Sequence, residues 1–356
     1  MNWNIPFRRK PFFIRLLHWE YWSFNILYSP IYMVWVWFSF RARSFFFFAA
    51  ANPSIKNGGF LAESKKDISA LIPSALQPKT AFFSIPSNPD IVLNELYERG
   101  LRFPLIGKPD MGAKGRGIMA LRDQKDLIAY VRSSFTNFHI QEFVAYKLEV
   151  GVFYYRFPDK ETGNVSGIVR KEFLKVKGDG RSNIRELLGE NERGVLQIGK
   201  LEKSGEVNLN QVLDAGVERI VVPYGNHARG AKFIDDSHLI DQSMTETIDN
   251  ICKKIPGFYF GRLDIRYQDW ESLKQGKNFS IIEVNGAGSE PTHIYDPRHS
   301  MLYAWKEIIR HLNILYKISV QNHRRGHPYL TVREGMKMFK EDRLNSKKLA
   351  AMDIKV

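Results

Sequence analysis

Cysteine is almost absent from this chain of 356 residues, in which Cys252 is the only one. A single thiol excludes an internal disulfide framework and a cysteine-based metal cluster, so we expect Cys252 to be buried or chemically idle. No Ser/His/Asp or Cys/His constellation is apparent, and a covalent enzyme nucleophile is therefore not expected. The composition, with 44% hydrophobic and 25% charged residues, indicates a globular protein with two or three subdomains.

Acidic residues are scarce relative to basic ones: 38 Asp and Glu stand against 52 Lys and Arg, for a net charge of +14. Residues 1–50 and residues 321–356 each carry +5 of this excess. A nucleic-acid-binding protein more often has a basic stripe across its folded domain, so we expect no nucleic-acid partner. Basic ends leave two alternatives open: contact with an anionic surface such as a membrane, or solvated tails.

The first 50 residues include 18 aromatic ones, and the 20-residue run from Tyr21 to Phe40 carries no charge. Such a run could just span a bilayer, but Pro30 interrupts it, and Trp and Tyr favour the headgroup level. The small-residue cleavage site of a signal peptide is missing. Two alternatives remain: an interfacial or re-entrant helical pair, or helices packed against the protein core or a second subunit.

From about residue 51 onward, expected strands and helices are interleaved and no internal repeat is visible. This mixed order, with several hairpin-like neighbours, predicts an α+β fold and not a doubly wound parallel sheet. We expect strands near residues 79–85, 103–109, 118–121, 138–144, 149–157, 163–177, 261–267 and 281–285, and helices near residues 63–72, 88–100, 123–135, 181–192, 244–255 and 301–318.

A glycine-rich stretch that also carries cations, Asp110 to Gly117, lies between two of the expected strands. The Rossmann and Walker patterns require a strand, a loop and then a helix, so this loop matches neither. One interpretation is a hairpin whose N–H groups and cations close over a polyphosphate; the other is an ordinary hairpin turn. Lys108, on the strand before the loop, favours the phosphate interpretation.

Two further strand-like runs, "GRLDIRY" and "IIEVNGAGSE", carry charged or polar groups at alternate positions. On a strand, Arg262 and Asp264 share one face while apolar neighbours point the other way, and Glu283 and Asn285 repeat the arrangement. Burying such groups without partners is costly, so we expect a charged ligand between them.

Together these motifs resemble the ATP-grasp superfamily of carboxylate–amine ligases, over about Ser64 to His311. In that family a lysine in a "KP" context precedes a flexible glycine-rich loop, and both hold phosphates. The resemblance implies an ATP-grasp fold with two β-rich lobes, preceded here by a short aromatic helical segment in place of a Rossmann-like domain. It implies an ATP site formed by Lys108, Gly112, Lys114, Gly115, Arg116, Gly117, Glu142, Phe143, Val144 and Glu149, with Glu149 on the ribose.

The family's metal site consists of an Asp on one strand and Glu-x-Asn on the next. By resemblance, Asp264, Glu283 and Asn285 take these places and bind magnesium, or alternatively manganese. Arg262 matches an arginine that stabilises the acyl-phosphate transition state, helped by the backbone near Gly286 and Gly288. A structural ion-pair cluster is the alternative interpretation.

Finer similarity points to cyanophycin synthetase and D-alanine–D-alanine ligase. In this comparison Lys171 takes the place of a catalytic cation ahead of the turn at residues 178–180. The same comparison places substrate contacts at Asn226, Gly288, Ser289 and His293, although packing is an equal alternative for His293. Either Lys65 or Lys66 could be a further phosphate-binding lysine.

The implied activity is ATP-dependent ligation of a small carboxylate to an amine through an acyl phosphate, on an amino acid or an envelope-related acid. Phosphate transfer to another acceptor, polysaccharide modification and a non-catalytic nucleotide-binding module are the alternatives. We expect a cytoplasmic protein, with contact to the inner face of a membrane and oligomerisation both left open. The expected segments are an aromatic, basic N-terminus (1–50), two lobes (51–135 and 136–320) and a basic C-terminal tail (321–356).

Overall fold

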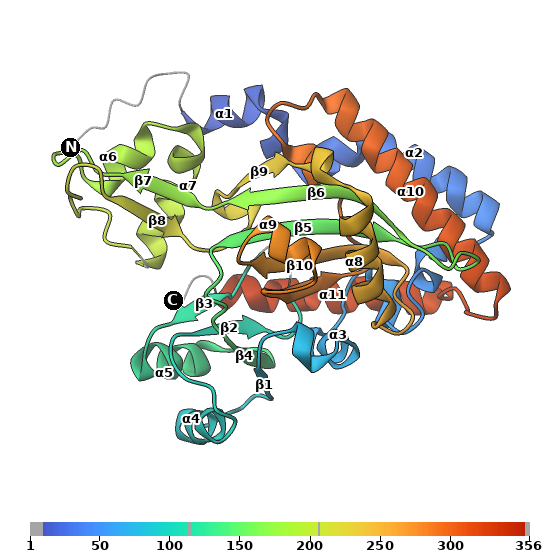
Figure 1. Cartoon of the computed structure of the whole chain (residues 1–356), viewed down its shortest axis with the longest axis horizontal. Coiled ribbons are helices and arrows are strands. Elements are labelled where there is room, and N and C mark those ends of the chain that lie inside the picture. The colour runs from blue at the N-terminus through green and yellow to red at the C-terminus, as the bar shows by residue number, and fades with distance from the viewer. Residues whose placement is uncertain (1–9, 113–114, 206, 353–356) are drawn as a thin grey trace.

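The computed structural model describes residues 10–112, 115–205 and 207–352. Two lobes built around antiparallel sheets are joined to helices contributed by both ends of the chain (Figure 1). The predicted α+β class is confirmed. Cys252 is buried, as expected from the sequence.

The first lobe is a four-stranded sheet with the order β1-β4-β2-β3. Its buried side chains form one hydrophobic cluster with two helices, α4 and α5, whose first turns are capped by Asn88 and Asp123. A third helix, α3, leads into the lobe and packs Ile68 against the core of the second lobe. The elements are α3 (Lys65–Leu71), β1 (Thr80–Phe83), α4 (Pro89–Glu98), β2 (Leu105–Pro109), β3 (Met119–Leu121), α5 (Gln124–Ser133) and β4 (Phe138–Glu142).

The second lobe is a five-stranded sheet with the order β11-β10-β5-β6-β9. One face packs on α8, and the other face contributes Phe153 and Phe260 to a cluster with α10. The sheet is therefore covered on both faces. A ligand-binding site can form at the end of the sheet that faces the first lobe. The elements are β5 (Leu148–Tyr155), β6 (Asn164–Glu172), β9 (Lys232–Asp235), α8 (Gln242–Lys253), β10 (Phe260–Tyr267), α9 (Trp270–Lys274), β11 (Phe279–Asn285) and α10 (Met301–Arg324).

A small subdomain is inserted between β6 and β9 (Figure 1). It pairs β7 (Leu174–Lys177) with β8 (Glu218–Val222) and packs them on α6 (Ile184–Gly189) and α7 (Glu192–Ser204). The helix expected at residues 181–192 is shorter than predicted, because Asn191 caps the N-terminus of α7 and starts a new helix there.

The N-terminal aromatic segment folds as α1 (Pro11–Leu17) and α2 (Phe24–Ala42). Pro30 does not break α2: the carbonyl of Ile26, which Pro30 cannot bond, accepts a 2.9 Å hydrogen bond from the Ser29 hydroxyl. Among the described residues, no helix is long and apolar enough to cross a membrane.

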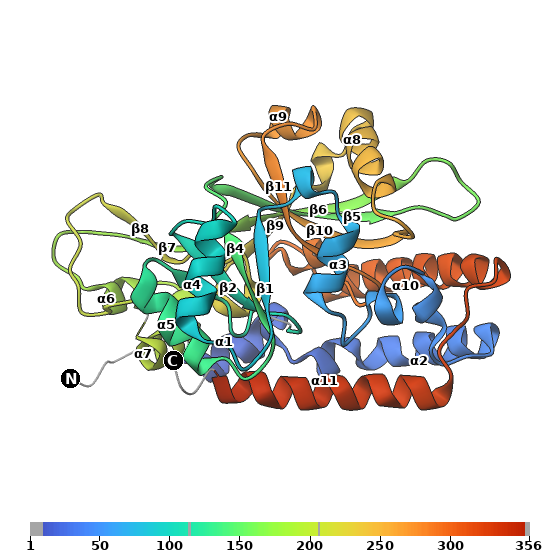
Figure 2. The ribbon, with the colours of Figure 1, turned by 90° about the horizontal axis from the view of Figure 1, so that it is seen from below.

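Two boundaries differ from the expected ones. β4 pairs with β1 and β2, so the first lobe extends to Glu142 and not to residue 135. The C-terminal segment, expected to be a basic tail, completes α10 and then forms a long helix, α11 (Val332–Met352). Figure 2 shows α11 along the lower edge of the molecule, the side on which α1 and α2 also lie, and Figure 1 shows it apart from these two helices.

Candidate functional site

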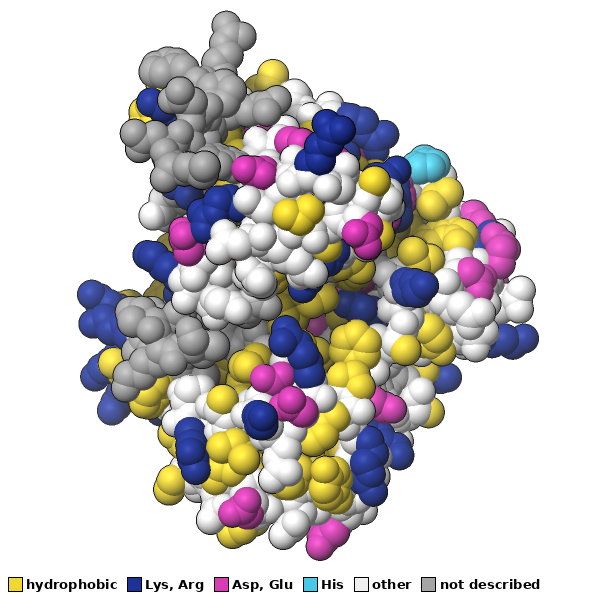
Figure 3. Space-filling view, turned by 90° about the vertical axis from the view of Figure 1, so that its left-hand side faces the viewer, with side chains coloured by type: hydrophobic (Ala, Val, Ile, Leu, Met, Phe, Trp, Pro, Cys, Tyr) yellow, Lys and Arg dark blue, Asp and Glu magenta, His cyan; other side chains and the backbone are white. Residues whose placement is uncertain are grey.

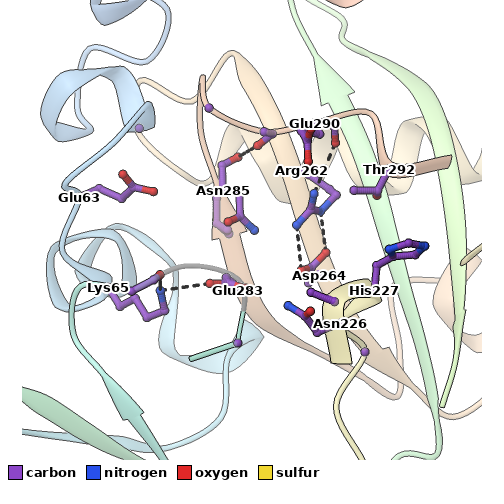
Figure 4. Close-up of a pocket in the computed structure, with 18 of the residues that line it drawn as sticks. Glu63, Lys65, Asn226, His227, Arg262, Asp264, Glu283, Asn285, Glu290 and Thr292 are labelled. Atoms are coloured by element: carbon purple, nitrogen blue, oxygen red, sulfur yellow. Dashed lines mark hydrogen bonds and ion pairs between the residues drawn. The ribbon is translucent and has the colours of Figure 1, made fainter. Parts of the chain in front are cut away.

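The alternating polar residues of β10 and β11 meet across the sheet. Asp264 lies directly opposite Glu283, and Arg262 lies opposite Asn285 (Figure 4). On the other face of β10, Leu263 and Ile265 are fully buried. The pattern read from the sequence thus produces a polar face at the end of the sheet that is nearest the first lobe.

This face lines a cavity of about 1170 Å³ between the lobes. Figure 3 shows the hollow on this side of the molecule, bordered by hydrophobic and basic side chains. Most of the predicted site residues line the cavity: Lys108, Gly112, Gly115, Arg116, Glu142, Phe143, Val144, Glu149, Lys171, Asn226, Arg262, Asp264, Glu283, Asn285, Gly288 and Ser289. Gly117 and His293 do not line it. Lys114 lies outside the described residues.

Buried ion pairs connect the strands beneath the cavity. The Lys171 ammonium lies 3.0 Å from both Glu149 Oε1 and Asp264 Oδ2. Arg262 Nε is 2.9 Å from Asp264 Oδ1, and Arg266 Nε is 3.2 Å from Glu149 Oε2. Both carboxylates are therefore bridged by cations, which offsets the cost of burying them.

The cations also keep the facing carboxylates ionised. Burial opposes ionisation, but Arg262 and Lys171 hold the pKa of Asp264 below its usual value. Burial also opposes the ionisation of Glu283, but the nearby charge of Lys65 holds the pKa of this carboxyl below its usual value. The site therefore presents two negatively charged groups side by side, a suitable environment for a divalent cation.

The first lobe contributes two lysines of different character. Lys65 Nζ lies 3.2 Å from Glu283 Oε1 and donates a hydrogen bond to the Gly112 carbonyl (3.0 Å), whereas the neighbouring Lys66 is exposed and does not line the cavity. Of the two candidates, Lys65 is thus the one placed at the site (Figure 4).

Lys108 projects into the cavity from β2, where its ammonium donates a 2.7 Å hydrogen bond to Gln141 Oε1. Burial lowers the pKa of Lys108 to about 8, and the charge of Lys65 adds to this effect, while Glu283 opposes it. A buried ammonium held by a neutral amide gains from the arrival of an anion such as a phosphate group.

The glycine-rich loop joins β2 to β3, as predicted, and these strands pair in an antiparallel hairpin. Gly115 and Gly117 have φ angles of +70° and +67°, which favour glycine. Arg229 Nη1 approaches the carbonyls of Gly115 and Ile118 at 3.5 and 3.4 Å. The loop therefore also contacts the segment after β8.

The backbone amides of residues 287–289, which were expected to help stabilise an oxyanion, are hydrogen-bonded to carbonyl groups of the chain itself. The amides of Ala287 and Gly288 donate 2.9 Å hydrogen bonds to the carbonyls of Gly58 and Gly59. The Ser289 amide and hydroxyl both donate to the Gly286 carbonyl, at 2.9 and 2.6 Å. In this conformation these backbone groups secure a turn, which leaves Arg262 as the predicted oxyanion partner that faces the cavity.

His293 is buried outside the cavity, where its Nε2 lies 3.4 Å from Glu307 Oε2 and its ring is next to that of His311. This placement agrees with the packing alternative for His293. Glu142 is the last residue of β4, and Phe143 and Val144 follow it; all three line the cavity at the connection between the two lobes.

Several cavity residues were not among the residues predicted from the sequence. Arg266 continues the alternation of Arg262 and Asp264 by two more positions, so the strand pattern itself could have revealed it. Gln141, His139 and Thr292 carry no motif; they reach the cavity only through strand pairing and chain folding. Glu290 lies near Arg262 in Figure 4 and accepts a 3.1 Å hydrogen bond from the Tyr295 hydroxyl.

The donor set fits a magnesium ion shared with phosphate oxygens. Mg²⁺ usually binds through one or two carboxylates together with substrate phosphates, and not in a cage made by protein alone. Here Asp264, Glu283 and Asn285 supply hard oxygen donors. Asn285 Nδ2, a hydrogen-bond donor and not a metal ligand, is buried without a partner among the described residues and fits an acceptor such as a phosphate oxygen. Within those residues, no group of three or more His, Cys, Asp or Glu side chains could hold a metal.

No family model and no curated protein matches the chain. Solved structures that match include D-alanine–D-alanine ligase from Bacillus anthracis, with 13% identity, a TM-score of 0.41, and coverage of 74% of this chain and 68% of the ligase. VanG D-Ala:D-Ser ligase from Enterococcus faecalis matches with 15% identity, a TM-score of 0.38, and coverage of 73% and 60%.

A bifunctional glutathione synthetase from Pasteurella multocida matches with 14% identity and a TM-score of 0.35, over 69% of this chain and 36% of that protein. This chain thus spans little more than a third of the synthetase. All three are ATP-grasp ligases, the class that the sequence motifs resemble. At such identities the likeness assigns neither a substrate nor an activity, which must be argued from the side chains.

Proposed function

We propose that this chain is an ATP-dependent ligase that joins a carboxylate to an amine through an acyl phosphate. The observation that carries the proposal is the pairing of Asp264 with Glu283 across β10 and β11, facing Lys65 and Lys108 of the other lobe. Two carboxylates opposite two lysines can hold a divalent cation and a triphosphate together.

In this proposal the adenine lies against Phe143 and Val144, and Lys65, Lys108 and the glycine-rich loop hold the phosphates. Glu149 is the candidate ribose contact, although both its oxygens are bonded to Lys171 and Arg266. Magnesium, when held by Asp264, Glu283 and Asn285, would neutralise charge on the transferred phosphoryl group.

Arg262 is the group that we assign to the substrate carboxylate. Its guanidinium lies between Asp264 and the carbonyl of Glu290, from which Nη1 is 3.4 Å away. A planar guanidinium can bind a carboxylate and then stabilise the oxyanion that forms when an amine attacks the acyl phosphate. Lys171 supports this role by holding Asp264, whose Oδ2 it contacts at 3.0 Å.

The experiment is to measure ADP release with Mg²⁺ and ATP across a panel of amino acids and small carboxylic acids, with product analysis by mass spectrometry. We expect release that depends on both a carboxylate and an amine, with an amide product. ADP with a phosphorylated product would instead establish phosphate transfer, and tight ATP binding without turnover would establish a non-catalytic module.

The role of Arg262 is tested with the variant Arg262→Lys, which keeps the charge and removes the planar fork of the guanidinium. We expect it to bind Mg·ADP as the wild type does and to lose at least tenfold in turnover. Equal turnover in Arg262→Lys and wild type would contradict the assignment of Arg262.

A further inference from the structure

The cavity continues beyond the polar site into an arm walled by helices. On α2, the residues Tyr28, Ile31, Tyr32 and Trp35 line it at the spacing of one helix face. On α10, Ile308, His311, Leu312 and Leu315 line it at the same spacing. Ile31 of α2 packs with Ile308, Leu312 and Leu315 of α10 in one hydrophobic cluster, and the same side chains form the apolar wall at this end of the cavity.

Polar atoms without partners mark the walls of this arm. Among the described residues, Trp35 Nε1 and Thr292 Oγ1 are buried and accept or donate no hydrogen bond. Thr292 is only 8% exposed and projects toward Arg262 in Figure 4. Buried polar atoms nearly always have hydrogen-bond partners. Two such atoms without partners in the wall of a cavity therefore indicate a ligand that supplies the missing hydrogen bonds.

We propose that this arm binds the apolar part of an amphiphilic substrate, whose polar end reaches Thr292 and Arg262. This inference rests on the proposed ligase function and narrows its substrate class to an acid that carries an alkyl or aryl chain. The stretch from Phe24 to Trp35 is about 16 Å long along the helix axis, which suits an extended chain. An apolar lining with a few polar groups at one end is typical of sites for such ligands.

The test uses straight-chain carboxylates from acetate to octanoate as probes, with calorimetry in the presence of Mg²⁺ and a non-hydrolysable ATP analogue. In wild type we expect the Kd to fall roughly threefold to fourfold for each added methylene. A Kd that does not change with chain length overturns the inference. Binding is measured without turnover, so this result is independent of whether amide formation is detected.

Matched variants come from opposite faces of α2. Tyr32→Ala and Trp35→Phe should weaken octanoate at least threefold and leave acetate unchanged, while Trp37→Ala, on the outward face, should bind both as wild type does. Tyr32 is 46% exposed, so its loss should leave the protein folded even if Trp35, whose Nε1 is buried, does not tolerate change. Unchanged octanoate binding in Tyr32→Ala and Trp35→Phe would overturn the proposed lining.

A second, independent observation concerns the outward face of the same helix. Met33, Trp37 and Phe40 are 78%, 58% and 78% exposed. On α1, Phe12, Leu16 and Leu17 are also more than half exposed. A folded chain rarely leaves so many large apolar side chains in water unless they dock on something.

Exposed cations flank these apolar residues in the sequence: Lys10 before α1, and Arg41 and Arg43 at the end of α2. Arg15 of α1 is also exposed but lines the cavity. Tryptophan with apolar neighbours, rimmed by lysine and arginine, is the composition of helices that lie in the interface of an anionic bilayer. We infer that this face of α1 and α2 docks on an anionic lipid surface, without crossing it.

Flotation with vesicles of phosphatidylcholine, with and without 30% phosphatidylglycerol, tests this inference. We expect binding only to the anionic vesicles, weakened at high salt because screening reduces the attraction. Trp37→Ala combined with Phe40→Ala should reduce binding at least tenfold, whereas Ile91→Ala, an exposed apolar residue of α4, should not. No vesicle binding together with a concentration-dependent dimer would overturn it in favour of a second copy as the occupant.

Discussion

The side chain of Asn345 in α11 donates a 2.8 Å hydrogen bond to the carbonyl of Met111 at the start of the glycine-rich loop. Nearby, Leu349 of the same helix packs against Gly112, and Lys56 Nζ lies 3.0 Å from Glu341 Oε2. A helix near the C-terminus therefore positions the loop that we assign to phosphate binding. The loop is therefore supported from outside the lobe to which it belongs.

This contact predicts that Asn345→Ala loosens the start of the loop. Removing one hydrogen bond should cost about 1 kcal/mol locally, so the amides near Met111 should exchange about fivefold faster with solvent. Hydrogen–deuterium exchange with mass spectrometry measures this directly. Lys347→Ala, on the same helix, is the control and should exchange as wild type does. Equal exchange in Asn345→Ala and wild type would show that α11 does not restrain the loop.

Lys108 predicts a pH dependence of nucleotide binding. Its pKa of about 8 means that the free protein loses this positive charge as the pH rises through 8. A bound phosphate favours the charged form, so affinity should be constant below pH 8. Above it, affinity should fall by up to tenfold per pH unit, until the pKa of the complex is reached.

The measurement is the Kd of Mg·ADP between pH 7 and pH 9.5. Lys108→Arg stays charged throughout this range and should remove the dependence. If the arginine variant weakens with pH as wild type does, another group is responsible.

Asp264→Asn should separate metal binding from nucleotide binding. The amide keeps the shape of the side chain, but Arg262 and Lys171 lose their shared counter-charge. We expect a loss of roughly 3–5 kcal/mol in the free energy of unfolding, seen as a lower Tm, and at least a hundredfold drop in ADP release. Mg²⁺ should no longer strengthen ADP binding, whereas the exposed Asp159→Asn should behave as wild type.

The sequence was most informative where chemistry follows strand periodicity. Because side chains alternate on a strand, the two-residue spacing of Arg262 and Asp264 alone predicts that they share one face. The glycine-rich hairpin was predictable for a similar reason, since glycines and turn residues between two apolar runs favour a hairpin. These features depend only on neighbours in the sequence.

What escaped prediction depends on distant contacts. Gln141 reaches Lys108 only because β4 inserts between β1 and β2, and no local pattern fixes that order. The C-terminal segment has no motif, and it docks as α11 through contacts with distant residues, such as Met338 in the cluster with α2 and α10 and Asn345 with Met111. For α2, the sequence left membrane contact and core packing as alternatives. The structure packs one face of the helix in a cluster with α10, beside the cavity, and leaves the other face in solvent.

Gly225 makes a closing prediction about the buried ion pairs. A Cβ atom at this position would lie 2.1 Å from Glu149 Oε1 and 2.7 Å from Lys171 Cδ, closer than any real contact. Gly225→Ala should therefore push Glu149 and Lys171 apart, lower the Tm by several degrees and reduce ADP release. Gly199→Ala is the matched control, because a Cβ there meets nothing within 4 Å and Gly199 lies inside α7. Alanine should stabilise that helix by about 0.4–1 kcal/mol without affecting turnover. If both substitutions raise the Tm equally, the close approach of Gly225 to the Glu149–Lys171 pair does not exist in solution.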